Sequence, residues 1–240
     1  MLTQRGFSSM TSVCIITARG GSKRIPRKNI REFCGKPIIA YSIEAALESE
    51  LFDEVMVSTD DEEIAEVARS YGAKVPFMRS EATSNDFAVT EDVVVEVLES
   101  YKDKLGVSFD NVCCIYPTAP FVSVCELQEA FGKLNSANSV VPVTEFDFPP
   151  QRAFKVDGNG FAEYAHPEFA TARSQDLEPL CHDCGRFYFA KTVALLKYHD
   201  FIMPGCAVVR IPPERVQDID TEDDWRLAEL KFEALQHFNS

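Results

Sequence analysis

Short apolar runs alternate with longer amphipathic segments along the first 145 residues of the chain. A nearly continuous apolar run is typical of a strand buried on both faces, and such runs lie at residues 12–17, 54–58, 74–77, 111–116 and 139–144. Apolar positions at helical spacing predict helices over residues 37–49, 61–71, 90–105 and 123–135. This alternation predicts an α/β fold with a doubly wound, mostly parallel sheet.

Polar and glycine residues at the expected helix ends support these boundaries. Ser123 and Glu126 have the spacing of a capping box, in which each side chain bonds the backbone N–H of the other. Thr90 is a candidate N-cap, because its hydroxyl can accept from an amide of the first turn. Gly72 suits the left-handed conformation that often ends a helix.

The regular alternation ends after residue 144. A proline-rich stretch follows, and the turn residues 157–160 (Asp-Gly-Asn-Gly) separate two short strand-like runs, which predicts a hairpin. We interpret about residues 145–185 as a small insertion that serves as a lid or a dimerisation contact. The pattern then resumes with predicted elements at residues 186–190, 192–198 and 207–211, and with a final amphipathic helix capped by Thr221.

Length and composition favour one domain. The chain has 240 residues, of which 45% are hydrophobic, so it is long enough to bury a sizeable core. We expect a disordered N-terminal extension over residues 1–11, a single domain over 12–232 and a C-terminal tail over 233–240.

The sequence also favours a cytoplasmic location. No run approaches the roughly 20 apolar residues that a membrane-spanning helix needs. The first twelve residues lack the apolar core of a secretory signal. The eight cysteines are therefore expected to be free thiols in a reducing compartment. Cys181 and Cys184 have CxxC spacing, but no second pair exists to complete a zinc site.

Charge is distributed unevenly along the chain. The formal net charge of −14 argues against nucleic acid as a partner, because affinity for long polyanions comes mainly from Lys and Arg on phosphates. Residues 19–36 nevertheless hold seven basic side chains and one acidic one, whereas residues 44–103 hold seventeen acidic and four basic ones. An acidic protein that concentrates cations in one short segment is expected to hold a small anion there.

The basic segment directly follows the first predicted strand, and ligands of open α/β sheets bind beyond the carboxyl ends of strands. Gly20 and Gly21 allow backbone N–H groups to turn toward a phosphate. Arg19 can grip phosphate oxygens as a fork, and Lys23 and Lys28 can act as mobile point charges. The segment matches neither the Walker A pattern nor GxGxxG. The alternative interpretation is a solvated basic turn.

A pair of aspartates precedes the last predicted helix. Alternation along an extended segment places Asp218 and Asp220 on the same side. Paired carboxylates suit Mg²⁺, which prefers hard oxygen ligands and usually completes its shell with water and substrate phosphates. The alternative is that Asp220 or Thr221 only caps the helix while Asp218 is exposed. Spacing alone does not decide between the two.

Two further segments are weaker candidates for substrate contact. Tyr116 precedes a stiff turn with two prolines, at the carboxyl end of a predicted strand. In and after the insertion, Arg173 can recognise a carboxylate and His182 can titrate near neutral pH. A histidine beside an aspartate, here Asp183, is more often structural.

Four motifs in order resemble those of the cytidylyltransferases that activate acidic nine-carbon sugars. The motifs are residues 18–23 continuing to Lys28-Asn29, then Ser58-Thr59-Asp60, Pro117-Thr118-Ala119-Pro120 and Asp218-Ile219-Asp220. The resemblance covers about residues 12–232. It implies a Rossmann-like nucleotidyltransferase fold, a homodimer and a Mg²⁺-dependent transfer of CMP from CTP to a nonulosonic acid, with release of pyrophosphate.

The motifs and the resemblance together assign expected roles to individual residues. The nucleotide-binding set is Arg19, Gly20, Gly21, Ser22, Lys23, Asn29, Arg79, Ala88 and Thr90. The catalytic set is Arg19, Lys23, Lys28 and Asp220, and the metal pair is Asp218 and Asp220. The sugar-binding set is Tyr116, Gln151, Arg173, Gln175, His182 and Tyr188.

The identity of the sugar rests on the more variable segments. Residues 114–121, 148–153 and 173–177 resemble family members that act on pseudaminic acid, and sialic and legionaminic acid are the alternatives. Tyr116 and Cys184 replace the Gln and Asn that are usual in members acting on sialic acid. A non-catalytic nucleotide-binding scaffold is the rival from another class, and the intact cationic and carboxylate residues argue against it.

Overall fold

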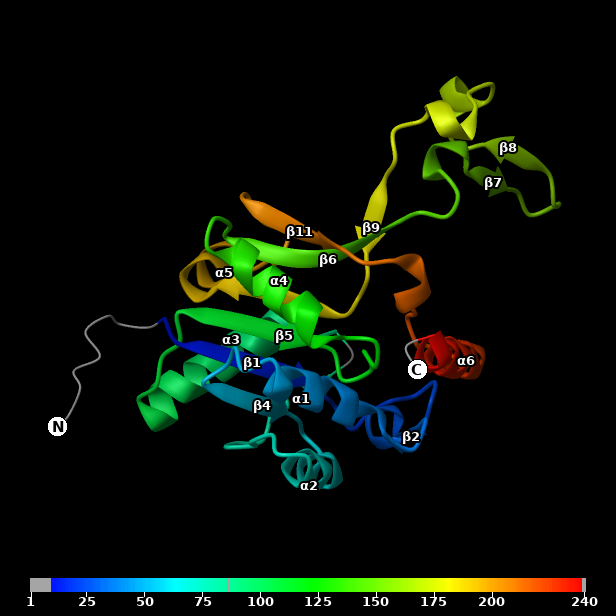
Figure 1. Ribbon diagram of the computed structural model, residues 1–240. Coiled ribbons are helices and arrows are strands. Elements are labelled where there is room, and N and C mark those ends of the chain that lie inside the picture. The colour runs from blue at the N-terminus through cyan, green and yellow to red at the C-terminus, as the bar shows by residue number, and fades with distance from the viewer. Residues whose placement is uncertain (1–9, 86, 239–240) are drawn as a thin grey trace.

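A seven-stranded sheet forms the centre of the computed structural model, which describes residues 10–85 and 87–238 (Figure 1). Its order is β11-β6-β10-β5-β1-β4, and β9 also pairs with β6. The strands are β1 (Ser12–Thr17), β4 (Glu54–Ser58), β5 (Asn111–Ile115), β6 (Ser139–Glu145), β9 (Cys181–Asp183), β10 (Phe187–Lys191) and β11 (Cys206–Arg210). Parallel pairs join β1 to β4 and β5, and β11 to β6. The predicted α/β fold with a mostly parallel sheet is confirmed.

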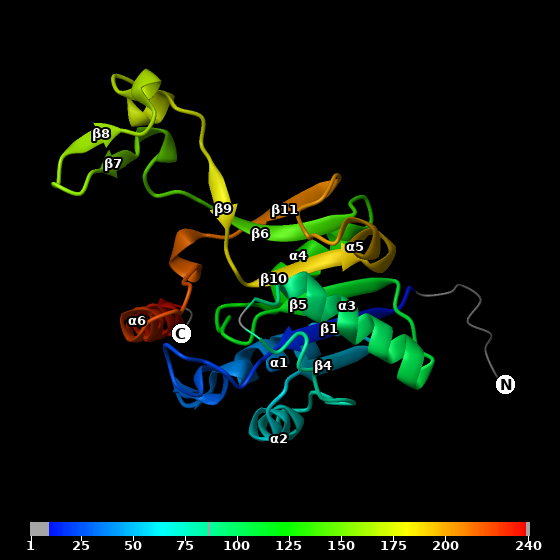
Figure 2. The same ribbon diagram turned by 180° about the vertical axis from the view of Figure 1, so that it is seen from behind.

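Helices cover both faces of the sheet (Figures 1 and 2). One face carries α1 (Ile38–Glu48), α2 (Glu62–Ser70) and α4 (Val124–Leu134), and the other carries α3 (Thr90–Ser100) and α5 (Thr192–Tyr198). The central strands β1 and β5 are apolar almost throughout because each is buried between these two layers. Within the described part of the chain, no helix is both long and apolar enough to cross a bilayer.

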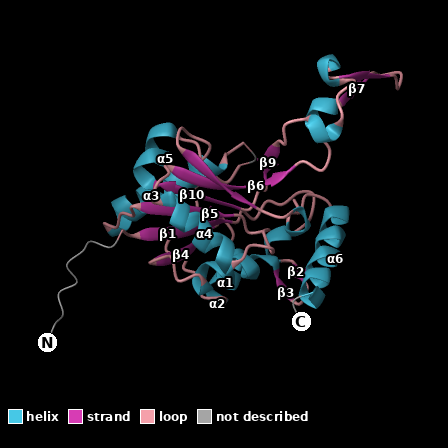
Figure 3. Ribbon diagram, turned by 45° about the horizontal axis from the view of Figure 1, so that its top comes forward, coloured by secondary structure: helices cyan, strands magenta, loops and turns pink. Residues whose placement is uncertain are grey.

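A third apolar cluster joins the last helix, α6 (Glu222–Phe238), to the segment after β1. Trp225 of α6 packs edge-on against Phe33 at 5.5 Å between ring centroids. Ile25 and Ile219 are almost completely buried in the same cluster. Figure 3 shows α6 standing across the loops at one end of the sheet. The cluster therefore brings the basic segment and the aspartate pair to the same end of the fold.

Several sequence predictions hold closely at the element ends. Ser123 and Glu126 form the predicted capping box. Gly72 adopts a left-handed conformation (φ 93°) after α2. Helix α5 has the predicted bounds, and the last helix starts at Glu222, where Thr221 Oγ1 accepts from the Asp224 N–H at 3.2 Å.

Other predictions were wrong. Residues 74–77 form a single bridge, between Lys74 and Met56, because Pro76 has no N–H to extend a ladder. Thr90 is the first residue of α3 and not its cap, since Val89 holds the N-cap position. The predicted helix over residues 90–105 is itself confirmed, with its last turn, Tyr101–Leu105, π-helical.

The chain ends also differ from expectation. Thr11 is already fixed, because its N–H donates to Asp110 Oδ2 at 2.8 Å. The rest of the expected N-terminal extension, residues 1–9, lies outside the described residues. At the other end, α6 runs through Phe238, so residues 233–238 are helical. Residues 239–240 lie outside the described residues.

The predicted insertion is an arm that leaves the sheet after β6 and returns through β9 (Figure 1). It contains the predicted hairpin, β7 (Phe154–Val156) and β8 (Ala162–Tyr164), and three short 3₁₀ turns. Both ends of the arm lie at the carboxyl end of β6, so the returning strands β9 and β10 run antiparallel to their neighbours. Because β9 belongs to the sheet, the arm proper spans residues 146–180.

A second short hairpin connects the basic segment to α1. It pairs β2 (Glu32–Phe33) with β3 (Lys36–Pro37). Cys34 and Gly35 form its turn, with φ angles of 44° and 97°. The positive φ of both residues is the signature of a type I′ turn, which sequence analysis missed because Cys-Gly is an unusual pair for it.

Candidate active site

A cavity of about 540 Å³ lies beyond the carboxyl ends of β1 and β5. This volume lies in the usual range for small-molecule sites. Its lining combines the segment after β1, the loop before α3 and the turn after β5. The sequence-predicted residues among those that line it are Arg19, Ser22, Lys23, Lys28, Asn29, Arg79, Ala88, Thr90 and Tyr116.

Gly20 lies behind this cavity, and the close approach of Asp61 leaves no room for a larger residue at this position. Its N–H donates to Asp60 Oδ1 at 2.8 Å. A Cβ on Gly20 would lie 2.9 Å from the Asp61 Cβ, a distance that real side chains do not tolerate. The Gly20 N–H is therefore engaged by a carboxylate, in contrast to the expectation that it turns toward a phosphate. Neither Gly20 nor Gly21 is among the residues that line the cavity.

Acidic residues at the start of α2 hold the basic segment in place. Arg27, in the left-handed region at φ 55°, forms a fork on Asp61 with contacts of 2.5 and 3.0 Å and also bonds Glu63. Asp61 accepts from the Ile64 N–H as the N-cap of α2. The hydrogen bond from Arg27 holds the pKa of Asp61 below its ordinary value. Sequence analysis missed this anchor, although the acidic run after β4 signalled it.

Two buried polar groups shape the far wall of the cavity. The Arg79 guanidinium donates to Ser58 Oγ at 3.0 Å and to the Ser58 carbonyl at 2.6 Å, and burial lowers its pKa. Asn29 donates from Nδ2 to the Arg19 carbonyl at 2.9 Å. Arg19 in turn donates to the Asn85 carbonyl at 2.9 Å. These contacts fix the backbone from which Arg19 and its neighbours reach the cavity.

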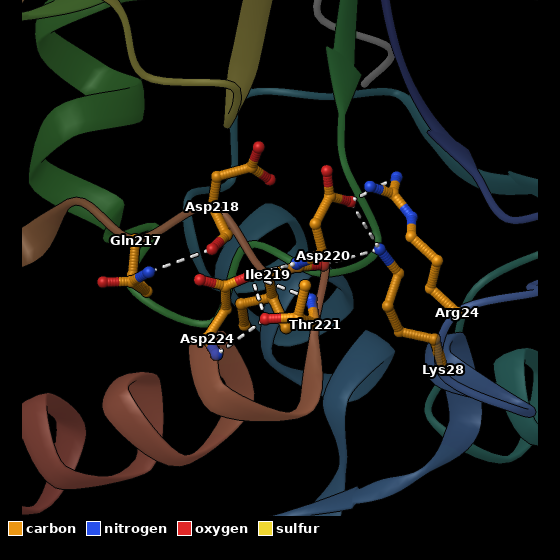
Figure 4. A network of polar contacts seen from close by, with 8 residues as sticks. All are labelled: Arg24, Lys28, Gln217, Asp218, Ile219, Asp220, Thr221 and Asp224. Carbon is orange, nitrogen blue, oxygen red and sulfur yellow. Dashed lines mark hydrogen bonds and ion pairs between the residues drawn. The ribbon is translucent and has the colours of Figure 1, made fainter. Parts of the chain in front are cut away.

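The aspartate pair faces the basic segment (Figure 4). The carboxylates of Asp218 and Asp220 point to the same side, while the side chain of Ile219 is buried between them. Arg24 Nη2 lies 2.8 Å from Asp220 Oδ1. Lys28 Nζ donates to the Ile219 carbonyl at 2.7 Å and lies 3.6 Å from Asp220 Oδ1. Lys28 thus connects the two predicted motifs.

The Asp220 carboxylate does not cap α6. Asp224 Oδ2 accepts from the Thr221 N–H at 2.8 Å and from the Thr221 hydroxyl at 2.7 Å. The Thr221 hydroxyl accepts from the Asp224 N–H, so the capping alternative holds for Thr221 and is wrong for Asp220. Asp218 is exposed, as that alternative expected, and partial desolvation together with the nearby charge of Asp220 raises the pKa of its carboxyl.

The donor set of this pair fits a hard cation that brings further ligands. Two carboxylates on one side of an extended segment suit Mg²⁺, which takes the rest of its shell from water and phosphates. Among the described residues, no three His, Cys, Asp or Glu side chains cluster closely enough to hold a metal by themselves. Cys181 and Cys184 are both free thiols.

A polar network lies between this cavity and two neighbouring ones and lines all three. The Thr90 and Tyr116 hydroxyls are 3.0 Å apart, and Tyr188 donates to Asp183 Oδ2 at 2.6 Å. Burial raises the pKa of both tyrosines. A cavity of about 330 Å³ is lined by these four residues, and one of about 720 Å³ is lined by Asp183, His182 and Asp218. Shared lining residues connect the three cavities into one series.

The remaining predicted sugar-binding residues lie on the arm, away from these cavities. Arg173, whose side chain is 71% exposed, forms a fork on Asp176 at 2.6 and 3.1 Å. Gln151 donates to the Glu178 carbonyl at 2.9 Å, and Gln175 lines a small cavity at the base of the arm, which shares Glu145, Phe146 and Asp147 with the cavity of about 720 Å³. In this chain the arm does not bring these side chains to the nucleotide cavity.

A buried ionic cluster braces the loops around the site. Arg186, whose side chain is 3% exposed, pairs with Glu126 at 2.8 Å and bonds the Phe121 carbonyl. Arg215 donates to the same carbonyl at 3.1 Å and lies 3.4 Å from Glu126. The cluster joins the turn after Tyr116 to the segment that leads to the aspartate pair. Sequence analysis missed it, although an arginine beside an apolar strand was a signal.

Comparison with known proteins decides the family. The family profile described as "Cytidylyltransferase" matches residues 13–176. The chain belongs to this cytidylyltransferase family. Its relatives include a pseudaminic acid cytidylyltransferase of Campylobacter jejuni subsp. jejuni, 44% identical over 94% of this chain and 97% of the relative. A CMP-N,N'-diacetyllegionaminic acid synthase of Legionella pneumophila is 34% identical over 95% of this chain and 98% of the relative.

The fold of this cytidylyltransferase also has solved counterparts. A structure of CMP:2-keto-3-deoxy-manno-octonic acid synthetase complexed with CTP superposes with a TM-score of 0.68 at 19% identity, and covers 95% of this chain and 99% of that one. The prediction of a Rossmann-like nucleotidyltransferase fold and of a cytidylyltransferase is confirmed.

Proposed function

We propose that this cytidylyltransferase transfers CMP from CTP to pseudaminic acid and releases pyrophosphate. One observation carries the proposal: the cationic segment after β1 and the aspartate pair before α6 meet at the same end of the sheet, beside one cavity. The 44% identity to a pseudaminic acid cytidylyltransferase supports the choice of sugar. Legionaminic and sialic acid are the alternative acceptors.

The first cavity is the proposed CTP site. Arg19 and Lys23 supply positive charge for the triphosphate, and Ser22 supplies a hydroxyl donor. Asn29 holds the backbone of the segment, and Gly20 allows its close approach to Asp61. Arg79, Ala88 and Thr90 form the wall where cytosine and ribose would lie.

The reaction needs charge stabilisation more than a covalent nucleophile. The anomeric oxygen of the sugar forms a bond to the α-phosphorus as the bond from that phosphorus to the pyrophosphate oxygen breaks. Phosphoryl transfers of this kind depend mostly on positioning and electrostatics. Arg19, Lys23 and Lys28 orient and neutralise the phosphates. Asp218 and Asp220 would hold Mg²⁺, which would supply further positive charge at the phosphates.

The other two parts of the cavity series, of about 330 and 720 Å³, are the proposed sugar site. Tyr116 and Tyr188 present a buried aromatic wall with two hydroxyls, and His182 lies beside it on the Phe146 ring at 4.7 Å. Gln151 and Arg173 bond neighbours within the arm, so we infer that the arm brings them, with Gln175, to the sugar site of a second copy of the chain.

A homodimer is therefore part of the proposal. The arm exposes large apolar side chains, with Phe148, Phe154 and Phe161 at 86%, 58% and 75% exposure. Exposed aromatic side chains grouped on one element are typical of interaction surfaces. Light scattering at micromolar concentration should give twice the 26.9 kDa chain mass, and a monomer mass would refute the dimer.

The free thiols of all eight cysteines and the use of CTP support a cytoplasmic location. The proposed activity is tested by measuring pyrophosphate release from CTP and Mg²⁺ with pseudaminic, legionaminic and sialic acid. We expect release with pseudaminic acid at the highest kcat/KM. Release with only one of the other sugars would transfer the proposal to that sugar. No release above background with any of them would refute the function.

A further inference from the structure

Arg24 is an additional cation at the site, next to Lys23. Its guanidinium lies 2.8 Å from Asp220 Oδ1, an oxygen of the proposed metal pair (Figure 4). Its side chain also lines the nucleotide cavity beside Lys23. Arg24 can therefore serve two anions, the aspartate in one position and a triphosphate in the other.

The two cations on Asp220 differ in how firmly they are held. The Lys28 side chain is 20% exposed and is fixed by its hydrogen bond to the Ile219 carbonyl. The Arg24 side chain is 66% exposed, and Asp220 is its ion-pair partner. Exposed ion pairs are weak and exchange readily. Arg24 is thus the cation that can leave Asp220 while Lys28 stays.

The contacts of Asp220 oppose the binding of a metal by itself. Three carboxylates, Asp218, Asp220 and Asp224, lie near two cations, Arg24 and Lys28, which cancel most of their negative charge. An incoming Mg²⁺ would meet a reduced attraction and would have to displace a guanidinium already on Asp220. A triphosphate changes this balance, because it adds negative charge and offers Arg24 an alternative partner.

We propose that Arg24 occupies Asp220 in the free enzyme and moves to the triphosphate when the metal–nucleotide complex binds. This inference rests on the proposed function, in which Asp218 and Asp220 hold the metal. Arg24 then couples the two ligands: it weakens the binding of metal alone and strengthens the binding of CTP when metal is present. Such coupling is reciprocal and typically amounts to a factor of 5–150 in affinity.

The test measures metal and nucleotide binding without catalysis. Mn²⁺ is titrated into the full chain without nucleotide, and the free aquo ion is counted by electron paramagnetic resonance. Arg24→Gln should bind Mn²⁺ about tenfold more tightly than wild type. In equilibrium dialysis with saturating Mg²⁺ and no sugar, the same variant should bind CTP about tenfold more weakly.

Two variants make these results specific. Arg69→Gln removes the same charge from an ion pair of the same 2.8 Å length on α2, and it should leave both affinities unchanged. The double variant Arg24→Gln/Asp220→Asn should lose the gain in Mn²⁺ affinity, because the gained metal site includes Asp220.

The outcomes separate this inference from the function on which it rests. Equal Mn²⁺ affinity in wild type and Arg24→Gln would overturn the proposed exchange, whatever CTP does. A gain that survives in the double variant would also overturn it. A wild-type chain that binds no CTP in the presence of Mg²⁺ would overturn the proposed function, and the Mn²⁺ titration would still decide on Arg24.

Discussion

The end of the sheet and the arm carry the two halves of the predicted site, and they are built differently. At the end of the sheet, side chains from distant segments converge on one cavity and are held by buried partners, as Arg79 is held by Ser58. On the arm, Arg173 and Gln151 are exposed or bonded only to neighbours within the arm. The first region brings side chains from distant segments together within one chain, whereas the second does not.

This contrast has a physical basis. The nucleotide half of the site needs charges at fixed distances from phosphates. The loops at the carboxyl end of the sheet, braced by the Arg186–Glu126 pair, supply a rigid frame for these charges. The arm carries its predicted contacts on short turns with little core of its own, so it gains a defined position only by packing on another surface. We therefore expect the end of the sheet to determine nucleotide use and the arm to act on the sugar of a partner.

The largest effect is expected in the first region. Asp220→Ala should lower turnover by about a hundredfold or more, since metal charge stabilisation worth several kcal/mol is lost. Asp223→Ala, one turn away and 93% exposed, is the matched control and should keep normal turnover. The comparison is made by pyrophosphate release at saturating Mg²⁺. Near-normal turnover of Asp220→Ala there would exclude the metal role.

The buried cluster around Glu126 should contribute more to the free energy of unfolding than an exposed ion pair does. Glu126→Gln leaves two arginines without a buried counter-charge and should lower the free energy of unfolding by about 3 kcal/mol. Glu129→Gln on the same helix breaks only the exposed pair with Lys133 and should cost below about 1 kcal/mol. Urea unfolding measures both. Similar costs for the two variants would show that the buried cluster does not brace the site.

The arm should respond in the opposite way. Arg173→Ala should leave stability and the KM for CTP unchanged but lower kcat/KM for the sugar by about tenfold, since one charge-assisted contact is lost. Arg226→Ala, equally exposed on α6, is the control. Steady-state kinetics with each substrate varied in turn measures the KM for CTP and the kcat/KM for the sugar separately. A rise in the KM for CTP with Arg173→Ala would remove the distinction between the regions.

The smallest effect concerns the anchor of the basic segment. Arg27→Gln should destabilise the protein by about 1 kcal/mol at pH 7. Asp61 has a folded-state pKa below its ordinary 3.8, so its contribution is complete above about pH 4 and is lost as the pH falls through the lower folded value. The difference between variant and wild type should therefore shrink below pH 4. A difference that is constant down to pH 2.5 would contradict this assignment.

Sequence patterns predicted the elements well where one local rule decides. The runs that became β1 and β4 are apolar between their end residues because both faces are covered, and the Ser123 box caps α4 through residues three positions apart. The strand predicted at residues 74–77 failed because Pro76 has no N–H to extend the pairing with β4 beyond the bridge at Lys74. Thr90 failed as a cap because its hydroxyl has a tertiary partner, Tyr116.

In the candidate site, too, local rules predicted some residues and missed the contacts between distant ones. Position after a strand was enough to predict that Arg19 and Lys23 line a ligand cavity. The contacts of Arg27 with Asp61 and of Arg24 with Asp220 join residues 34 and 196 positions apart, and no spacing rule reports such pairs. The contacts of the arm residues cannot be derived from one copy of the chain, because their proposed partner is another copy.

A mixed dimer tests the central claim most directly. One subunit carries Asp220→Ala, the other carries Arg173→Ala, and two affinity tags allow only mixed dimers to be purified. If the arm completes the partner's sugar site, one of the two sites is intact, and the mixed dimer should show about half the wild-type kcat/KM for the sugar. If each arm served its own chain, neither site would be intact, and about a twentieth of the wild-type value or less would remain.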